Sequence, residues 1–472
     1  MLQDRPLKTN NYLVYSVAIL MAIGASIWMS KGGIATGMIL LALPPIIIFM
    51  IVAFAKPHLL IHLIVLMGFL IVLISRYSNT DIPFGLTTDL IMLLVIIVLI
   101  LNKDITKRKE AIFNPLTLAL LVWLGLTILE ILNPLAASRV AWFYAIRALA
   151  LYPVILVIIT ILIFDKKIYL KQFLFIWAVL ELIASIWGMK QLFFGVSATE
   201  QAWLNAGAAQ THILFGRLRV FSFMSDAAQF GATQAHAAIV FGIIGLYKGN
   251  LKYRFLILAI AAVALYGMLI SGTRGALGIL ALGGFTYFTF SKNFRIVLVG
   301  LAAAGGLFIF LKYTTILQSN YQINRLRTAL NTEDASFMVR KRREQVLKNY
   351  MADKPFGGGV GSAGFWGQRF SPGSKLATLG TDGHYTRIWM ETGIIGLVIY
   401  LGLLAVIIAY LGKLLWKMPD SLLKQILVGF YSGFLGLCLS SYTNGLITQI
   451  PTSSVLFITL GFVYLGANDK LE

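Results

Sequence analysis

The chain has 472 residues, of which 58% are hydrophobic and only 12% are charged, against about 25% charged residues in soluble domains. This composition excludes a soluble globular fold. The formal net charge of +20 favours anionic partners, such as phospholipid headgroups or a phosphorylated substrate. The single cysteine, Cys438, excludes a disulfide within one chain.

Long apolar runs follow one another along almost the whole sequence. We place them near residues 12–30, 34–55, 58–75, 86–101, 116–132, 148–164, 172–194, 227–247, 255–270, 275–290, 296–311, 386–411, 422–442 and 449–466. Each run is close to the roughly 20 residues that a membrane-spanning helix needs. The runs are continuous rather than alternating, which favours helices over a β-barrel. The sequence therefore predicts an all-α, polytopic integral membrane protein with about 14 (12 to 14) transmembrane helices.

Basic residues in the connections predict the orientation, because short loops rich in Lys and Arg stay in the cytoplasm. If the N-terminus, with Arg5 and Lys8, is cytoplasmic, the inside connections hold 19 Lys and Arg and the short outside connections hold 8. Both termini are therefore predicted to be cytoplasmic.

Two of the outside connections are long. The first covers about residues 195–226, within the helical region 1–311. The second covers about 312–385 and separates that region from the last helices, in residues 386–472. It carries eleven Lys and Arg against five Asp and Glu, a net charge of +6. Within it, residues 336–352 are predicted to be helical and the glycine-rich run 357–361 to be flexible.

One histidine has ionisable neighbours at helical spacing. If a helix begins near Gly383, then His384, Arg387 and Glu391 lie at i, i+3 and i+7 on one face. Ionisable groups at membrane depth are costly and usually functional. The alternative is an interfacial anchor in which Arg387 and Glu391 form an ion pair.

Three further arginines are predicted on the same side of the membrane. Arg217 and Arg219 end the shorter outside connection, where alternation puts both side chains on one side of an extended segment. Arg274 lies in a turn between two apolar helices. Guanidinium groups can bind a diphosphate bidentately, whereas snorkelling toward lipid headgroups is the alternative for each arginine. No group of His, Cys, Asp and Glu residues has the spacing of a catalytic metal site, so no metal ion is expected.

The run from His384 to Gly396, with Glu391-Thr392-Gly393 inside it, resembles the signature of the O-antigen ligase and O-antigen polymerase superfamily. These are integral-membrane glycosyltransferases of the bacterial envelope. Three other stretches agree in order: the arginine segment 216–226, the turn 271–275 and the glycine-containing run 355–361. Together the resemblance covers about residues 215–400.

The resemblance implies inverting transfer of a glycan from undecaprenyl diphosphate to an acceptor hydroxyl, in the biosynthesis of lipopolysaccharide or a related polysaccharide. The active site would face the periplasm, from a chain in the bacterial inner membrane. His384 would match the essential histidine, and Arg217 or Arg219 an essential arginine. The acceptor would be a glycan, a lipid A-core or a protein, and membrane lipids would surround the chain. No cofactor and no nucleic-acid partner are expected.

The chemistry of the residues is consistent with this reaction. Negative charge develops on the leaving diphosphate, so fixed cations placed there lower the barrier. A neutral imidazole such as that of His384 can position and deprotonate the incoming hydroxyl. The candidates for binding the diphosphate are Arg217, Arg219, Arg274 and Arg387, with Glu391 in a supporting role.

A second class of function stays open, namely a lipid-linked oligosaccharide flippase or another polytopic transporter. Glu181, predicted to be mid-membrane in the run 172–194, is the residue that best suits a transporter. Transporters usually have two repeated halves and short connections, and neither is evident here. Within the superfamily, ligase, polymerase and protein O-oligosaccharyltransferase differ in acceptor, and the sequence does not separate them.

Overall fold

The computed structural model describes residues 48–78, 85–102, 109–214, 216–292, 294–316, 318, 321–327, 335–380 and 383–471. The chain forms two compact units, residues 1–59 and 60–472. In the first unit, residues 48–55 are helical. The predicted span 12–30 and most of 34–55, together with Arg5 and Lys8, lie outside the described residues. All packing discussed below is within the second unit.

Eight helices in the described ranges are long and apolar enough to cross a membrane. They are α2 (His58–Tyr77), α5 with η2 (Pro115–Leu132), α6 to α7 (Arg139–Ile163), α8 (Lys167–Phe193), α11 (Ala227–Gly245), α12 (Arg254–Ser271), α19 (His384–Lys417) and α20 (Leu422–Ser440). Three shorter apolar helices are α3 (Gly85–Leu101), α13 (Ala276–Ser291) and α21 (Thr452–Ala467). The helix α14 (Phe294–Tyr313) lies at the predicted run 296–311. The expected all-α membrane fold is thus confirmed.

The helices begin where the sequence supplies caps. Asn114 accepts a hydrogen bond from the Thr117 N–H at the start of α5, whose first residue is a proline. Asp226 accepts bonds from the N–H groups of Ala228 and Gln229 at the start of α11. These side chains satisfy amide donors that have no partner within the helix, and they fix where each apolar run enters the bundle.

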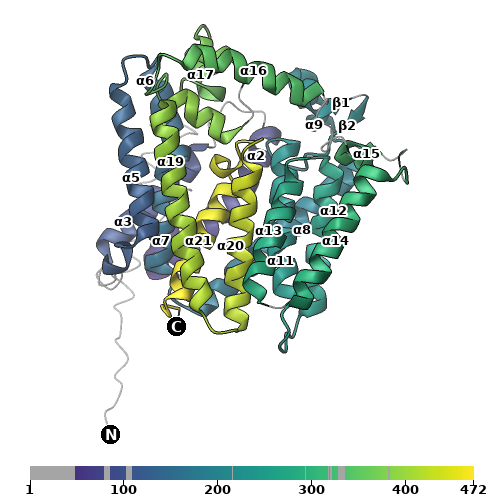
Figure 1. The fold of residues 1–472 in the computed structure, drawn as a ribbon. Coiled ribbons are helices and arrows are strands. Elements are labelled where there is room, and N and C mark those ends of the chain that lie inside the picture. Colours follow the sequence, from purple (N-terminus) through teal and green to yellow (C-terminus); the bar gives the residue numbers. More distant parts are fainter. Residues whose placement is uncertain are drawn as a thin grey trace, which may run out of the picture. The chain divides into compact units, whose positions relative to one another are not determined.

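The second unit is built around α11, which packs against α8, α12, α13 and α20 (Figure 1). Small residues allow this close approach. A Cβ at Gly231 of α11 would lie 2.3 Å from Oγ of Ser271 in α12, and one at Gly433 of α20 would lie 2.3 Å from Cδ2 of His236. Close backbone approach at small residues is the usual way in which membrane helices associate.

The segments between the long helices form short elements. Residues 194–226 contain α9 (Ala198–Trp203), the π-turn η4 (Leu204–Ala208), α10 (Ala209–His212) and a hairpin of β1 (Ile213–Leu214) and β2 (Arg217–Leu218). The later connection contains α15 (Tyr321–Arg327), α16 (Ala335–Met351), α17 (Gly364–Phe370) and α18 (Lys375–Thr378). The predicted helix 336–352 is confirmed by α16, which crosses one end of the long helices together with α17 (top of Figure 1).

The longest helix, α19, is interrupted at Gly393, where φ is 69° and ψ is −173°. The glycine-rich run 357–361 packs against this break. The N–H of Gly358 donates to the Met390 carbonyl and that of Gly359 to the Glu391 carbonyl, both at 2.9 Å. The N–H of Ile395 donates to the carbonyl of Pro355 at 3.3 Å.

The expectation that the run 357–361 is flexible is therefore wrong. All five of its residues are buried, and three of them, Gly357, Gly359 and Gly361, have φ between 75° and 87°. Only glycine adopts that backbone region readily. The glycines thus serve a close, ordered backbone contact with α19 rather than mobility, and this contact satisfies carbonyls that the helix break releases.

Candidate functional site

His384 is the first residue of α19, and the structure holds its ring tightly. Its backbone N–H donates to the carbonyl of Ser441 at 2.9 Å, and its Nε2 lies 2.9 Å from the hydroxyl of Tyr400. Its Nδ1 makes no hydrogen bond to the described residues. The residue is only 1% exposed. The imidazole thus has its Nε2 engaged, and its Nδ1 has no hydrogen-bond partner among the described residues, inside a nearly closed site.

Tyr400 is a site residue that the sequence did not reveal. It lies beyond the break at Gly393, so counting helical turns from His384 does not bring the two together. In the structure its ring packs against His384, with centroids 5.3 Å apart, and against Trp123 of α5, with centroids 4.8 Å apart. An aromatic residue sixteen positions away gives no periodic signal across a broken helix.

Arg387 and Glu391 form the expected ion pair on α19. Nε of Arg387 donates to Oε1 of Glu391 at 2.9 Å, and the carboxylate of Glu391 is fully buried. A second buried acid, Glu130, lies close enough to interact electrostatically with Glu391. Asn133 donates both to Oε2 of Glu130 at 2.8 Å and to the carbonyl of Phe356 at 3.0 Å. Both acids therefore flank the point where the glycine-rich run meets α19.

The structure brings the turn of Arg274 close to His384. The next residue, Gly275, packs so tightly on the turn 440–444 that a Cβ there would lie 2.6 Å from Oγ1 of Thr443. The same turn contains Ser441, which accepts the bond from the His384 N–H. Arg274 itself is partly exposed.

Arg217 and Arg219 belong to a different segment, the hairpin before α11. Arg217 lies in β2 and is exposed. Nη1 of Arg219 donates to the carbonyl of Thr211 at 3.1 Å. The expected extended conformation is present at β2, but no contact in the described ranges joins this pair directly to His384.

A buried acid organises that segment. Glu200 accepts hydrogen bonds from the Ser197 N–H at 2.7 Å, from Trp187 at 2.9 Å and from Gln191 at 2.8 Å. Burial raises the pKa of Glu200, but these bonds outweigh it and hold the pKa below its ordinary value. Burial lowers the pKa of His212, which lies in the same segment. Glu200 is thus ionised and His212 neutral at pH 7.

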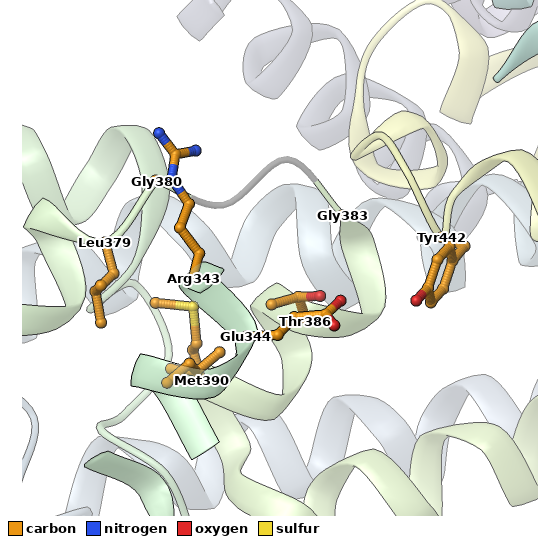
Figure 2. Close-up of a pocket in the computed structure, with 9 residues that line it drawn as sticks. Arg343, Glu344, Leu379, Gly380, Gly383, Thr386, Met390 and Tyr442 are labelled. Carbon is orange, nitrogen blue, oxygen red and sulfur yellow. The ribbon is translucent and has the colours of Figure 1, made fainter. Parts of the chain in front are cut away.

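A small cavity of about 40 Å³ lies beside the start of α19 (Figure 2). It is lined by Arg343 and Glu344 of α16, by Gly383 and Thr386, and by Tyr442. Figure 2 shows Glu344 and Thr386 together beside Tyr442, whereas Arg343 extends its guanidinium toward Gly380. This volume is far below the roughly 300 Å³ or more of ligand sites in proteins, so the cavity is too small for a sugar. The helix α16 therefore closes this side of the site in the present conformation.

No protein-family model matches the chain, and no curated protein is significantly similar to it.

Proposed function

We propose that the chain is an inverting, metal-independent glycosyltransferase of the bacterial inner membrane. It moves a glycan from undecaprenyl diphosphate to an acceptor hydroxyl on the periplasmic side, as an O-antigen ligase or polymerase does. The observation that carries the proposal is the arrangement at the start of α19. There a histidine whose Nδ1 has no hydrogen-bond partner among the described residues lies next to a turn with an arginine and near the ion pair of Arg387 with the buried Glu391.

In this proposal His384 activates the acceptor. If its Nε2–H donates to the Tyr400 oxygen, Nδ1 is the atom that accepts the proton of the incoming hydroxyl. The hydroxyl oxygen then forms the new bond to the anomeric carbon as the bond to the diphosphate breaks. Displacement from the opposite face inverts the anomeric centre. Tyr400 acts as a positioning residue, because it fixes the tautomer and the ring orientation.

The arginines stabilise the leaving diphosphate. Arg274 is best placed for this role, because its turn adjoins the segment that binds the backbone of His384. Arg217 and Arg219 contact the diphosphate from the hairpin side, and Arg387 is already paired with Glu391.

The acceptor can be identified in a deletion strain of the native bacterium. The length of the glycans on the lipid carrier and on the acceptor would be measured by gel electrophoresis and mass spectrometry. Long glycans that stay on the lipid carrier identify a ligase, and acceptors that carry single repeats identify a polymerase. Unchanged glycans on both lipid and acceptor would contradict the proposed function.

Glu181 favours the second candidate, a flippase or transporter. It is 1% exposed in α8, where its carboxylate accepts hydrogen bonds from Trp177 at 3.0 Å and from Gln234 of α11 at 2.7 Å. A buried carboxylate between two membrane helices is a common element of proton-coupled transport. Movement of a labelled lipid-linked glycan across proteoliposomes, lost in Glu181→Gln, would support this candidate over the transferase.

A further inference from the structure

A second and much larger cavity lies away from His384. Its volume is about 1010 Å³, at the upper end of the range for ligand sites in proteins. It lies between the ends of α2 and α3, the π-helical turn η3 (Arg147–Leu151), α9 and α17. None of the four arginines assigned above to the diphosphate lines it. We call this cavity the Arg76–Arg369 cleft.

Three arginines and no acidic residue are found among the described residues that line the cleft. Arg147 is neutralised, because its Nη1 pairs with the carboxylate of Asp89. Arg76 donates to the backbone carbonyls of Ser222 and Met224, and its guanidinium stacks 4.3 Å from the ring centroid of Trp203. The buried carboxylate of Glu200 attracts its charge but forms no direct ion pair with it among the described residues. Arg369 is exposed, and its guanidinium lies 5.5 Å from the ring centroid of Phe370. Neither forms an ion pair with the described residues, so the cleft favours an anion.

The rest of the lining is amphipathic. Ile71 and Val72 of α2 and Leu86 of α3 form an apolar wall, and both helices are apolar over their length. Trp203 and Trp366 line the cleft elsewhere. Arginine in the last turn of a membrane helix, with tryptophans at the same level, marks the boundary between hydrocarbon and water. The cleft therefore spans this boundary, with its cations at headgroup depth.

We propose that the Arg76–Arg369 cleft binds an anionic glycerophospholipid. The phosphodiester lies between Arg76 and Arg369, and an acyl chain lies along Ile71, Val72 and Leu86. A single phosphodiester fits the donors better than a diphosphate does, because Arg147 is already paired and Arg76 already uses two of its N–H groups on carbonyls. The site is independent of the proposed glycosyl transfer and would exist in a transporter as well.

The test measures lipid binding to the purified, delipidated full-length protein in detergent, by native mass spectrometry and by titration. The probes are phosphatidylglycerol, phosphatidylcholine and a polyprenyl diphosphate. We expect phosphatidylglycerol to bind at least about tenfold more tightly than phosphatidylcholine, and Arg369→Gln to weaken its binding about tenfold, the effect of one charge-assisted hydrogen bond. Arg342→Gln, which removes an exposed charge from α16, is the matched control and should change nothing.

Arg369 is the primary variant because no hydrogen bond joins its side chain to another of the described segments, whereas Arg76→Gln also breaks bonds to residues 222 and 224. The double variant should bind no better than Arg369→Gln. Equal affinity for the two phospholipids, or unchanged binding by Arg369→Gln, would overturn the proposal. Tighter binding of polyprenyl diphosphate that Arg369→Gln abolishes would overturn it too, because the cleft would then hold a glycan donor. None of these readouts depends on glycosyl transfer.

Discussion

Replacing His384 tests the catalytic assignment at the level of one side chain. The residue is 1% exposed, and its ring is hydrogen-bonded to Tyr400. His384→Ala therefore also leaves a buried hydroxyl without a partner, at a cost of about 1–3 kcal/mol in stability. We expect transfer to fall at least about 100-fold, measured with lipid-linked donor in proteoliposomes and with thermal unfolding as the folding control.

Tyr400→Phe separates chemistry from structure. It removes the hydroxyl and keeps the imidazole, so it should lower the rate much less than His384→Ala while costing similar stability. If His384→Ala is stable and transfers glycan at the normal rate, the histidine is not the base.

The arginines are predicted to differ in their effects. Arg274→Ala should cost about 2–4 kcal/mol in transition-state stabilisation, as expected for a lost contact with the leaving group, and more than either Arg217→Ala or Arg219→Ala. Replacement of the same arginine by lysine should restore the rate only in part, because an ammonium group does not reproduce the bidentate hydrogen bonds of a planar guanidinium. Transfer rates measured at saturating donor will show which of the three alanine variants loses most activity. Normal rates in all three would mean that the diphosphate binds elsewhere.

The effect of replacing Arg387 on glycan transfer is harder to interpret than that of replacing the other three arginines, because stability changes too. Removal of Arg387 leaves the buried carboxylate of Glu391 unpaired, and breaking a buried ion pair costs about 3–5 kcal/mol. A loss of activity in Arg387→Ala therefore has to be read together with its thermal stability.

Residue-level patterns in the sequence predicted local pairs better than distant ones. The spacing of Arg387 and Glu391 is sufficient to predict their ion pair, since residues four apart on a helix are neighbours. The contact of His384 with Tyr400 depends on how α19 continues beyond Gly393. The direction of α19 beyond Gly393 is set by contacts with the run 357–361. These contacts join segments about 30 residues apart, so local sequence patterns do not predict them.

At the level of elements, the glycine-rich run is predicted to tolerate no side chain where it meets the bundle. Gly359 has φ of 87°, and a Cβ there would lie 2.5 Å from Cβ of Ala136. Gly359→Ala should lower stability by about 3 kcal/mol, from backbone strain and overpacking combined. Gly373→Ala is the matched control, because a Cβ there meets nothing within 4 Å. Thermal unfolding in detergent measures both, and equal melting temperatures would contradict the assigned packing.

Helix positions were predictable for a simple physical reason. An apolar run of membrane length has to be helical to satisfy its own backbone, so the predicted run 227–247 matches Ala227–Gly245 and 172–194 matches Lys167–Phe193. The break in α19 was not predictable. Glycine is tolerated within membrane helices, so Gly393 looks like an ordinary helical glycine in the sequence. What marks the break is its hydrogen bonding to residues 355–359, which supply one carbonyl and two amides to α19.

For the whole molecule, the charge pattern predicts which side faces the cytoplasm. The native Cys438 is buried, so Cys438→Ala gives a suitable background for labelling. Cysteines at two exposed positions, Asn349 in α16 and Asn250 between α11 and α12, should lie on opposite sides. A membrane-impermeant maleimide added to spheroplasts should label Asn349→Cys directly and Asn250→Cys only after permeabilisation. The reverse pattern would invert the predicted topology.

The packing of the helices could not be derived from the sequence. Apolar faces do not choose partners in a bilayer, because lipid chains are as apolar as leucine side chains. The choice depends instead on small residues such as Gly231 and Gly433, and on polar contacts such as that between Glu181 and Gln234. The grouping of Arg274 with His384, and the separate Arg76–Arg369 cleft, follow from that packing.

The pairing of the run 355–361 with the break in α19 also sets an order of events during synthesis. The ribosome makes the glycine-rich run before it makes α19, so the amides of Gly358 and Gly359 are already available when the carbonyls of residues 390 and 391 emerge. Without that run, the interrupted helix would expose unsatisfied carbonyls to hydrocarbon. The partners of the break in α19 are thus made before α19 itself, so the last helices complete their backbone hydrogen bonds with a connecting segment that is already present.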